Sequence, residues 1–179
     1  MSFCLYCTAK KEVHAMVLFV LYVKADLDAI DLWEFPVNHR WCLDIKEPTS
    51  EEKREGVWVC DDELVDVPGG RGEAHFLMKW PGAKKESQLT IIRDVKKLTR
   101  PITGADSGEF VPVVGFDCRG LEPVAWYPEG GYTLTSAGGT AVFRDVNLAE
   151  DWSEYDEDGE QAVGIYSIEH KFVVVKDKK

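Results

Sequence analysis

Alternation of apolar and polar residues at every second position is the feature that most constrains how this chain can fold. Successive side chains of an extended strand point to opposite faces, so such a pattern is typical of a strand with one buried face. It is clearest from Gly164 to Val175, where Tyr166, Ile168, His170, Phe172 and Val174 are predicted to share one face, opposite Ser167, Glu169 and Lys171. We predict a half-buried antiparallel strand here.

The same period recurs along the chain, and long stretches with helical period are absent. In residues 39–45 we expect Trp41, Leu43 and Ile45 to face inward, and Arg40, Cys42 and Asp44 to face outward. Further strands are predicted at residues 17–23, 57–60, 73–80, 89–92, 109–116 and 140–144, separated by glycine- and proline-rich turns. The sequence therefore predicts an all-β or nearly all-β fold with mainly antiparallel strands.

A weak internal repeat suggests how these strands are organised. Residues 34–37 (EFPV) are echoed by residues 109–113 (EFVPV), and each half carries a Gly-Gly turn, at Gly69-Gly70 and Gly138-Gly139. We expect one domain over residues 16–179 made of two small related β-rich lobes, residues 16–95 and 105–179. Chance similarity between short β segments is the alternative.

The charge balance argues against a nucleic-acid partner. The 21 Lys and Arg residues face 32 Asp and Glu residues, which gives a net charge of -11, so a polyanion meets mostly repulsion. The short run 93–100 is the only candidate basic face, and a solvated linker is the simpler interpretation. We expect no nucleic-acid binding.

Cysteine usage indicates a reducing compartment. Five cysteines, an odd number, stand at positions 4, 7, 42, 60 and 118 without the regular spacing of a secreted disulfide framework. The apolar run 15–23 is too short to span a bilayer and has no clear cleavage site for export after it. We expect no membrane contact and a location in the cytoplasm, with the nucleus as an open alternative.

Two local features invite a ligand and have simpler explanations. The acidic run 150–160 (EDWSEYDEDGE) lacks the spacing of an EF-hand loop, so we interpret it as a solvated loop held by Trp152 and Tyr155. Gly69-Gly70-Arg71-Gly72 suits either an anion cradle or, more commonly, a turn between strands. His170 lies on an apolar face and is interpreted as a core histidine.

The run Phe116-Asp117-Cys118-Arg119-Gly120-Leu121-Glu122-Pro123-Val124, with Gly164-Ile165-Tyr166 after the acidic run, carries a family resemblance. Together with Lys24-Ala25, Arg40-Trp41 and Gly69 to Gly72, it resembles the eukaryotic family of CXXC motif containing zinc binding proteins. The resemblance covers residues 16–179 and places the family's initiator at Met16. It thus leaves residues 1–15 as an N-terminal extension that we expect to be poorly ordered.

The family resemblance implies a small β-rich protein that holds zinc through two Cys-x-x-Cys pairs, each at a tight turn. Carried over residue by residue, the first pair falls on Glu47 and Ser50, and the second on Trp80 and Ala83. We therefore expect no zinc and no other cofactor, and we hypothesise that the Trp80 indole fills the space of the metal and its thiolates. A relocated site would have to draw on His39, Cys42, Glu47, Cys60 and His75, whereas Cys4-x-x-Cys7 alone supplies half a tetrahedral site.

No recognisable catalytic motif is present, so we expect a protein that is not an enzyme. The first hypothesis is a monomeric scaffold or protein-interaction protein with an unknown protein partner, a member of the family that has lost its zinc site. Its candidate surface is the signature block Cys118, Arg119, Gly120, Leu121, Glu122 and Pro123. The alternative is a metal-handling protein with a rearranged or partner-completed site. A third hypothesis is a thiol-dependent enzyme that uses Cys118, whose pKa Arg119 would lower.

Overall fold

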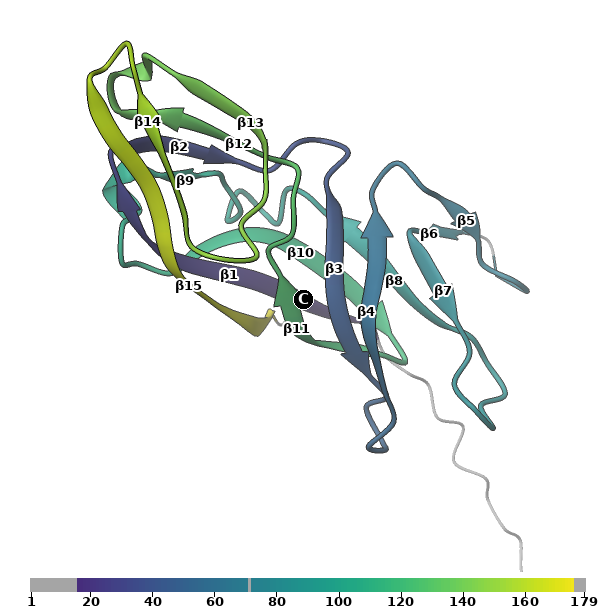
Figure 1. Ribbon diagram of the computed structural model, residues 1–179. Helices are drawn as coiled ribbons and strands as arrows, with labels where there is room; N and C mark the ends of the chain where they lie inside the picture. Colours follow the sequence, from purple (N-terminus) through teal and green to yellow (C-terminus); the bar gives the residue numbers. More distant parts are fainter. Residues whose placement is uncertain (1–15, 71, 176–179) are drawn as a thin grey trace, which may run out of the picture.

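A computed structural model describes residues 16–70 and 72–175, which form an all-β structure (Figure 1). The expected extension 1–15 lies outside the described residues. The strands are β1 (Val17–Asp28), β2 (Ile30–Glu34), β3 (Arg40–Lys46), β4 (Lys53–Cys60), β5 (Val65–Asp66), β6 (Glu73–Ala74), β7 (Phe76–Met78), β8 (Ser87–Ile92), β9 (Ile102–Thr103), β10 (Val111–Arg119), β11 (Glu122–Tyr127), β12 (Tyr132–Ser136), β13 (Val142–Val146), β14 (Trp152–Asp156) and β15 (Gln161–Val175). Two single 3-10 turns, η1 (Gly104–Asp106) and η2 (Ala137–Gly139), complete the list of elements. Along the described chain no helix is long and apolar enough to cross a membrane.

The strands form three larger sheets and one small ladder. The six-stranded sheet has the order β14-β15-β1-β10-β8-β7, the three-stranded sheet β11-β3-β4, and the four-stranded sheet β13-β12-β2-β9. The ladder pairs β5 with β6, and the strand pairs of all four sheets are antiparallel. The predicted all-β fold with antiparallel strands is confirmed.

The two halves of the chain are interleaved and do not form separate lobes at residues 16–95 and 105–179. Each of the three larger sheets contains strands from before and after residues 96–105: β1 lies between β10 and β15, β3 lies between β4 and β11, and β2 pairs with β12. One hydrophobic cluster extends through all three sheets. The two-lobe division was therefore wrong, because the weak repeat did not reveal which strands pair.

The long strand β15 shows both the strength and the limit of the alternation. Ile168, His170 and Phe172 are half-buried between exposed neighbours, as predicted. Nearer the start of the strand, however, the odd-numbered Val163 and Ile165 are the buried ones. A register shift against β1, opposite Lys24 to Asp26, separates the two patterns, because a bulge moves the buried face by one residue.

Strand β3 was predicted to be half-buried, but it is buried on both faces. Trp41, Leu43 and Ile45 face the core as expected, whereas Cys42 and Asp44, predicted outward, are also covered. β3 is the central strand of its sheet, and on the second face Cys42 lies between its register partners Tyr127 of β11 and Trp58 of β4. The Asp44 carboxylate accepts hydrogen bonds from the Gly56 N–H (2.9 Å) and the Tyr127 hydroxyl (2.7 Å), which satisfy a buried charge.

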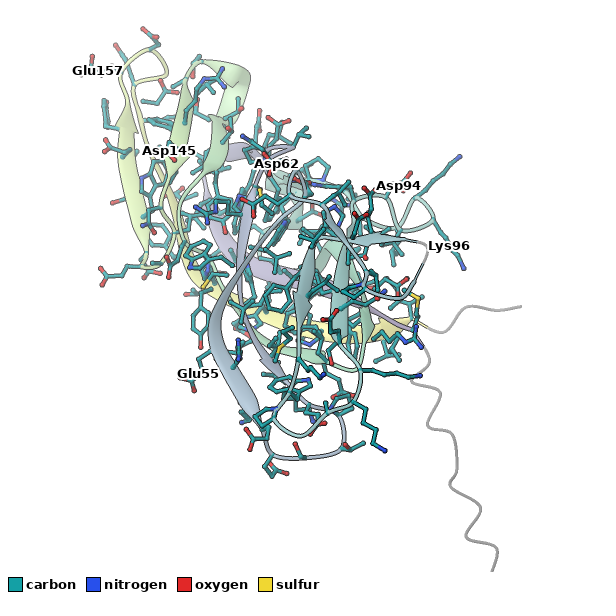
Figure 2. All side chains as sticks on the ribbon, turned by 90° about the vertical axis from the view of Figure 1, so that its right-hand side faces the viewer. Glu55, Asp62, Asp94, Lys96, Asp145 and Glu157 are labelled. Carbon is teal, nitrogen blue, oxygen red and sulfur yellow. The ribbon has the colours of Figure 1, made fainter. Side chains whose placement is uncertain are left out.

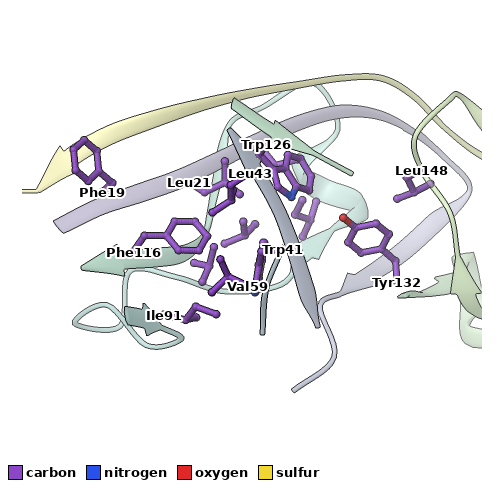
Figure 3. Packing of buried hydrophobic residues seen from close by; sticks show 14 of the residues in the cluster. Phe19, Leu21, Trp41, Leu43, Val59, Ile91, Phe116, Trp126, Tyr132 and Leu148 are labelled. Carbon is purple, nitrogen blue, oxygen red and sulfur yellow. The ribbon is translucent and has the colours of Figure 1, made fainter. Parts of the chain in front are cut away.

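The core is rich in large aromatic side chains (Figure 3). Among the largest fully buried side chains are Trp33, Trp41, Trp126, Tyr132 and Phe116. Phe35 stacks on both Trp33 and Trp41, with ring centroids 5.5 Å apart in each pair. Full burial of one such side chain stabilises a fold by about 2–3 kcal/mol, so this cluster supplies a large part of the hydrophobic stabilisation.

Candidate functional site

The two turns to which the resemblance assigns zinc ligands lie in two hairpins, β3–β4 and β7–β8, which the β5–β6 ladder separates along the chain. Glu47 and Ser50 lie in the turn between β3 and β4, and Trp80 and Ala83 lie in the turn between β7 and β8. Both turns are at the same end of the molecule as the connection from β10 to β11 (Figure 1). The β10–β11 connection is part of the signature block, so this end brings the implied zinc positions and the signature block together.

Trp80 is an interior residue of this end. Its side chain is only 4% exposed and belongs to the hydrophobic core, and the partly buried Ala83 packs against the same cluster. The indole Nε1–H donates to the Gly120 carbonyl oxygen at 2.9 Å, so the polar edge of the ring is satisfied. The Ala83 N–H donates to the Trp80 carbonyl oxygen at 3.1 Å and closes the turn.

The turn between β3 and β4 is satisfied by its own residues. The Ser50 hydroxyl donates to the Glu47 carboxylate, and the Glu47 N–H donates to the Glu52 carbonyl oxygen at 2.9 Å. Among Glu47, Ser50, Trp80 and Ala83 only the glutamate carries a usual zinc ligand, and zinc sites of this kind need four thiolates. The residues present therefore do not fit the four-cysteine zinc site that the resemblance implies.

The signature block forms a sharp connection between β10 and β11. Gly120 has a φ of +72°, and a Cβ at this position would lie 2.6 Å from Ser87 Oγ. Its carbonyl oxygen accepts from both Trp80 Nε1 (2.9 Å) and Ser87 Oγ (2.8 Å). Only glycine combines this backbone conformation with so close an approach. The block therefore fixes the β7–β8 hairpin against the end of β10.

As a candidate surface, the signature block is only partly exposed. Cys118, Leu121 and Pro123 are buried, which the alternation within a short segment did not reveal. Arg119 and Glu122 are half-buried, and Glu122 pairs with Lys46 (3.3 Å between Oε2 and Nζ). The prediction of a surface built around Cys118 to Pro123 was therefore wrong for these three buried side chains.

The Cys118 thiol is 1% exposed, at the end of the buried strand β10. Burial raises its pKa far above the ordinary value, and the nearby Asp117 and Glu122 carboxylates raise it further. The adjacent Arg119 does not reverse this. Nucleophilic cysteines need the opposite, an exposed thiol with a lowered pKa.

The other candidate metal ligands are dispersed. Throughout residues 16–70 and 72–175 no three His, Cys, Asp or Glu side chains form a group that could hold a metal ion. His39 is buried among Phe35, Trp41 and Tyr132, and burial, with a smaller contribution from Arg93, lowers its pKa to about 4. The remaining candidates are held separately: Cys42 and Cys60 are buried, and His75 Nδ1 accepts from the Ile91 N–H at 3.0 Å.

Comparison with known proteins decides the family. The family model of the eukaryotic CXXC motif containing zinc binding proteins matches residues 20–173. The chain belongs to this family. It is 40% identical over 166 residues to the UPF0587 protein CG4646 of Drosophila melanogaster, with 90% of this chain and 99% of that protein covered. It is 34% identical over 158 residues to the CXXC motif containing zinc binding protein of Homo sapiens, with 86% and 96% covered.

The fold agrees with this assignment. A solved structure of a hypothetical protein from Plasmodium falciparum superposes with a TM-score of 0.79 at 25% identity, covering 87% of this chain and 99% of that one. The family description names zinc, whereas the two turns of this member carry Glu47, Ser50, Trp80 and Ala83 at the positions that the resemblance assigns to zinc ligands. Within this family fold, three further residues have defined roles: His170, Asp156 and Arg93.

His170 stabilises the packing of β15 against β11. Its Nε2 accepts from the Trp126 N–H at 3.1 Å, and its ring packs edge-on against the Trp126 indole at 5.9 Å. Partial burial lowers its pKa. This agrees with the interpretation of a satisfied core histidine, because a neutral imidazole can accept this hydrogen bond.

The acidic run 150–160 is a hairpin and not the predicted solvated loop. β14 pairs with β15, and Trp152 packs against Phe143 at 5.2 Å, whereas Tyr155 is exposed. Asp156 is buried, and its carboxylate accepts from the Ser136 hydroxyl (2.6 Å), the Thr140 hydroxyl and the Gly159 N–H (2.9 Å). The next residue, Glu157, lies at the outer tip of the molecule (Figure 2). The run therefore contains one structural carboxylate inside a solvated acidic tip.

Asp156 should make the stability depend on pH in the acid range. Hydrogen bonds from Ser136, Thr140 and Gly159 lower its pKa from 3.8 to about 2. Because the pKa is lower in the folded state, the ionised carboxylate stabilises the fold at pH values above the pKa of the unfolded chain. This contribution is lost as the pH falls from about 4 to about 2. We expect Asp156→Asn to be less stable than the parent at pH 7, with a difference that narrows towards pH 2, in urea unfolding series. The exposed Glu154→Gln is the control, and a constant difference at all pH values would contradict the assignment.

The basic run 93–100 does not form a free basic face. Arg93 pairs with Asp61 and also donates to the Phe35, Pro36 and Val37 carbonyl oxygens. Arg100 donates to both Asp106 carboxylate oxygens from its two terminal nitrogens, Nη1 and Nη2, each at 2.7 Å. These two arginines are bound within the fold, so the run is not simply the solvated linker that was predicted.

Proposed function

We propose that this protein is a non-catalytic scaffold or protein-interaction protein, a family member in which the four-cysteine zinc site has been lost. The observation that carries the proposal is Trp80. At a position that the resemblance assigns to a zinc thiolate, a buried indole packs in the core and donates to Gly120. The end of the molecule that carries the two turns is thus held by packing and hydrogen bonds.

The positions of the reactive side chains support a role without catalysis. The Cys118 thiol is buried and its pKa is raised, and His170 accepts a backbone hydrogen bond, so neither is presented to a substrate. The carboxylate with the most hydrogen bonds in the acidic run, Asp156, is used to join β12, η2 and β14. We further propose that the protein acts as a monomer in the cytoplasm or nucleus, where its cysteines remain free thiols.

Zinc analysis of the purified full chain tests the proposal. To remove adventitious binding by the N-terminal pair, the protein should carry Cys4→Ser and Cys7→Ser. We expect zinc well below one ion per chain by elemental analysis, and an unchanged urea midpoint after treatment with a chelator. A structural zinc site contributes about 10–16 kcal/mol of apparent binding free energy, so its removal is readily detected. Stoichiometric zinc together with unfolding in chelator would favour the alternative, a metal-handling protein with a rearranged site.

A further inference from the structure

We propose that a groove beside the β10–β11 connection binds an aspartate- and glutamate-rich segment of a partner protein in extended conformation. The groove, called the basic groove below, has a volume of about 360 Å³, and its charged lining includes Lys79, Lys84, Lys85 and Arg119. This inference rests on the proposed interaction function and names the chemistry of the partner.

Three segments far apart in the sequence build the basic groove. The Pro68-Gly69-Gly70 turn forms one wall, the β7–β8 hairpin with its lysines forms another, and Arg119 and Gly120 at the end of β10 contribute the third. The carbonyl oxygen of Gly120 is held by Trp80 and Ser87, both of which are buried. The groove therefore has a wall that is fixed before any partner binds, which lowers the entropic cost of association.

The charge of the groove is opposite to that of the protein. The chain carries a net charge of -11, yet the four cations of the groove are accompanied by a single carboxylate, Glu86. Elsewhere cations are paired, as in Lys24 with Glu169, Lys46 with Glu122, Arg93 with Asp61, and Arg100 with Asp106. Within the described part of the chain, no ion pair involves Lys79, Lys84, Lys85 or Arg119. Unpaired cations gathered in one groove are complementary to an anionic partner.

An extended acidic segment fits these features better than a small anion does. Lys79, Lys84 and Lys85 are exposed on one hairpin, which suits several separate carboxylates along a chain. The Gly70 N–H already donates to the Val67 carbonyl oxygen at 3.0 Å, so this turn is a structural turn and its amide is not offered to a phosphate.

The position of β7 adds a second reason. β7 is the terminal strand of the six-stranded sheet, and in the described structure it pairs only with β8. A partner segment can add to a free strand edge through main-chain hydrogen bonds while its side chains reach neighbouring groups. A long nucleic acid, by contrast, extends beyond the groove and meets the negative charge of the rest of the molecule.

The binding of a fluorescein-labelled octaglutamate peptide to the full chain, followed by fluorescence anisotropy, tests the proposal. We expect binding that weakens between about 20 and about 150 mM NaCl, because the charges are screened, and no binding of octaglutamine. Lys84→Glu should weaken binding by about fivefold or more. Arg144→Glu, the same charge change at an exposed position of β13 outside the groove, should leave affinity within about twofold.

Several outcomes would overturn the proposal. The first is that octaglutamate does not bind at low salt. The second is that Lys84→Glu and Arg144→Glu lose the same amount of affinity for the peptide. The third is that inorganic tripolyphosphate or a single-stranded oligothymidylate binds more tightly than the peptide. Unfolding midpoints of both variants should match the parent, since both positions are exposed. If a protein partner is captured equally by the parent and by Lys84→Glu, the interaction function stands and this groove is not its site. If no partner and no peptide binds, both the proposed function and the groove fail.

Discussion

Replacing Trp80 with alanine is expected to lower the free energy of unfolding by about 3–5 kcal/mol. The side chain is only 4% exposed, so truncation leaves a cavity beside the core. It also removes one of the two hydrogen bonds to the Gly120 carbonyl oxygen, the other coming from Ser87. Urea unfolding followed by far-UV circular dichroism measures the loss. This result would show that the indole stabilises the β7–β8 turn, to which the resemblance assigns zinc ligands.

Two controls separate this effect from the loss of any tryptophan. Trp58 is 43% exposed and contacts Arg40, so Trp58→Ala should cost about 1 kcal/mol or less. Trp80→Phe keeps an aromatic ring but loses the hydrogen bond, and it should fall between the parent and the alanine variant. If Trp80→Ala costs no more than Trp58→Ala, the indole does not hold this end of the molecule and the proposed loss of the zinc site loses its main support.

Replacing Arg93 with methionine is expected to cost about 2–4 kcal/mol of unfolding free energy. Its guanidinium pairs with Asp61, whose side chain is 11% exposed, and donates to the Phe35, Pro36 and Val37 carbonyl oxygens. Without it, a nearly buried carboxylate has no counter-charge. The loop between β2 and β3 also loses the group that joins it to the segment after β8. The urea midpoint is the measurement.

Arg144→Met is the matched control for this substitution. Arg144 is exposed on β13, so the same change of side chain there should alter stability by about 0.5 kcal/mol or less. A second variant, Arg93→Met with Asp61→Asn, removes the unpaired charge and should recover part of the loss. If the single and double variants are equally stable, the pair with Asp61 contributes little and the carbonyl contacts account for the effect.

Local patterns predicted strands well where one face meets the core and the other meets water. They missed β2, β11, β12 and β14, each five or six residues long. In β14 the buried position is Asp156, which is inside because Ser136, Thr140 and Gly159 satisfy its carboxylate. An apolar pattern cannot report burial that depends on hydrogen bonds from other segments. The predicted strand 73–80 was similarly divided, into β6 and β7, with Trp80 beyond its end.

The positions of the candidate site came from the family resemblance, and their geometry was not predicted. Glu47, Ser50, Trp80 and Ala83 lie in two hairpin turns, and the burial of Trp80 agrees with the hypothesis that it fills apolar space. The inward positions of Leu121 and Pro123 were not foreseen. The basic groove was missed as well, because its lysines and Arg119 are separated by more than thirty residues.

The sequence by itself determined the all-β class, most of the long strands and the family, because alternation and short motifs in a fixed order are properties that can be read along the chain. Only the tertiary structure decided which strands pair, which polar groups are buried, and which cations gather in one groove. Trp80 and Gly120 are 40 residues apart, and Tyr127 and Asp44 are 83 apart, yet each pair shares a hydrogen bond. Such contacts follow from long-range strand pairing, which a period of two residues does not encode.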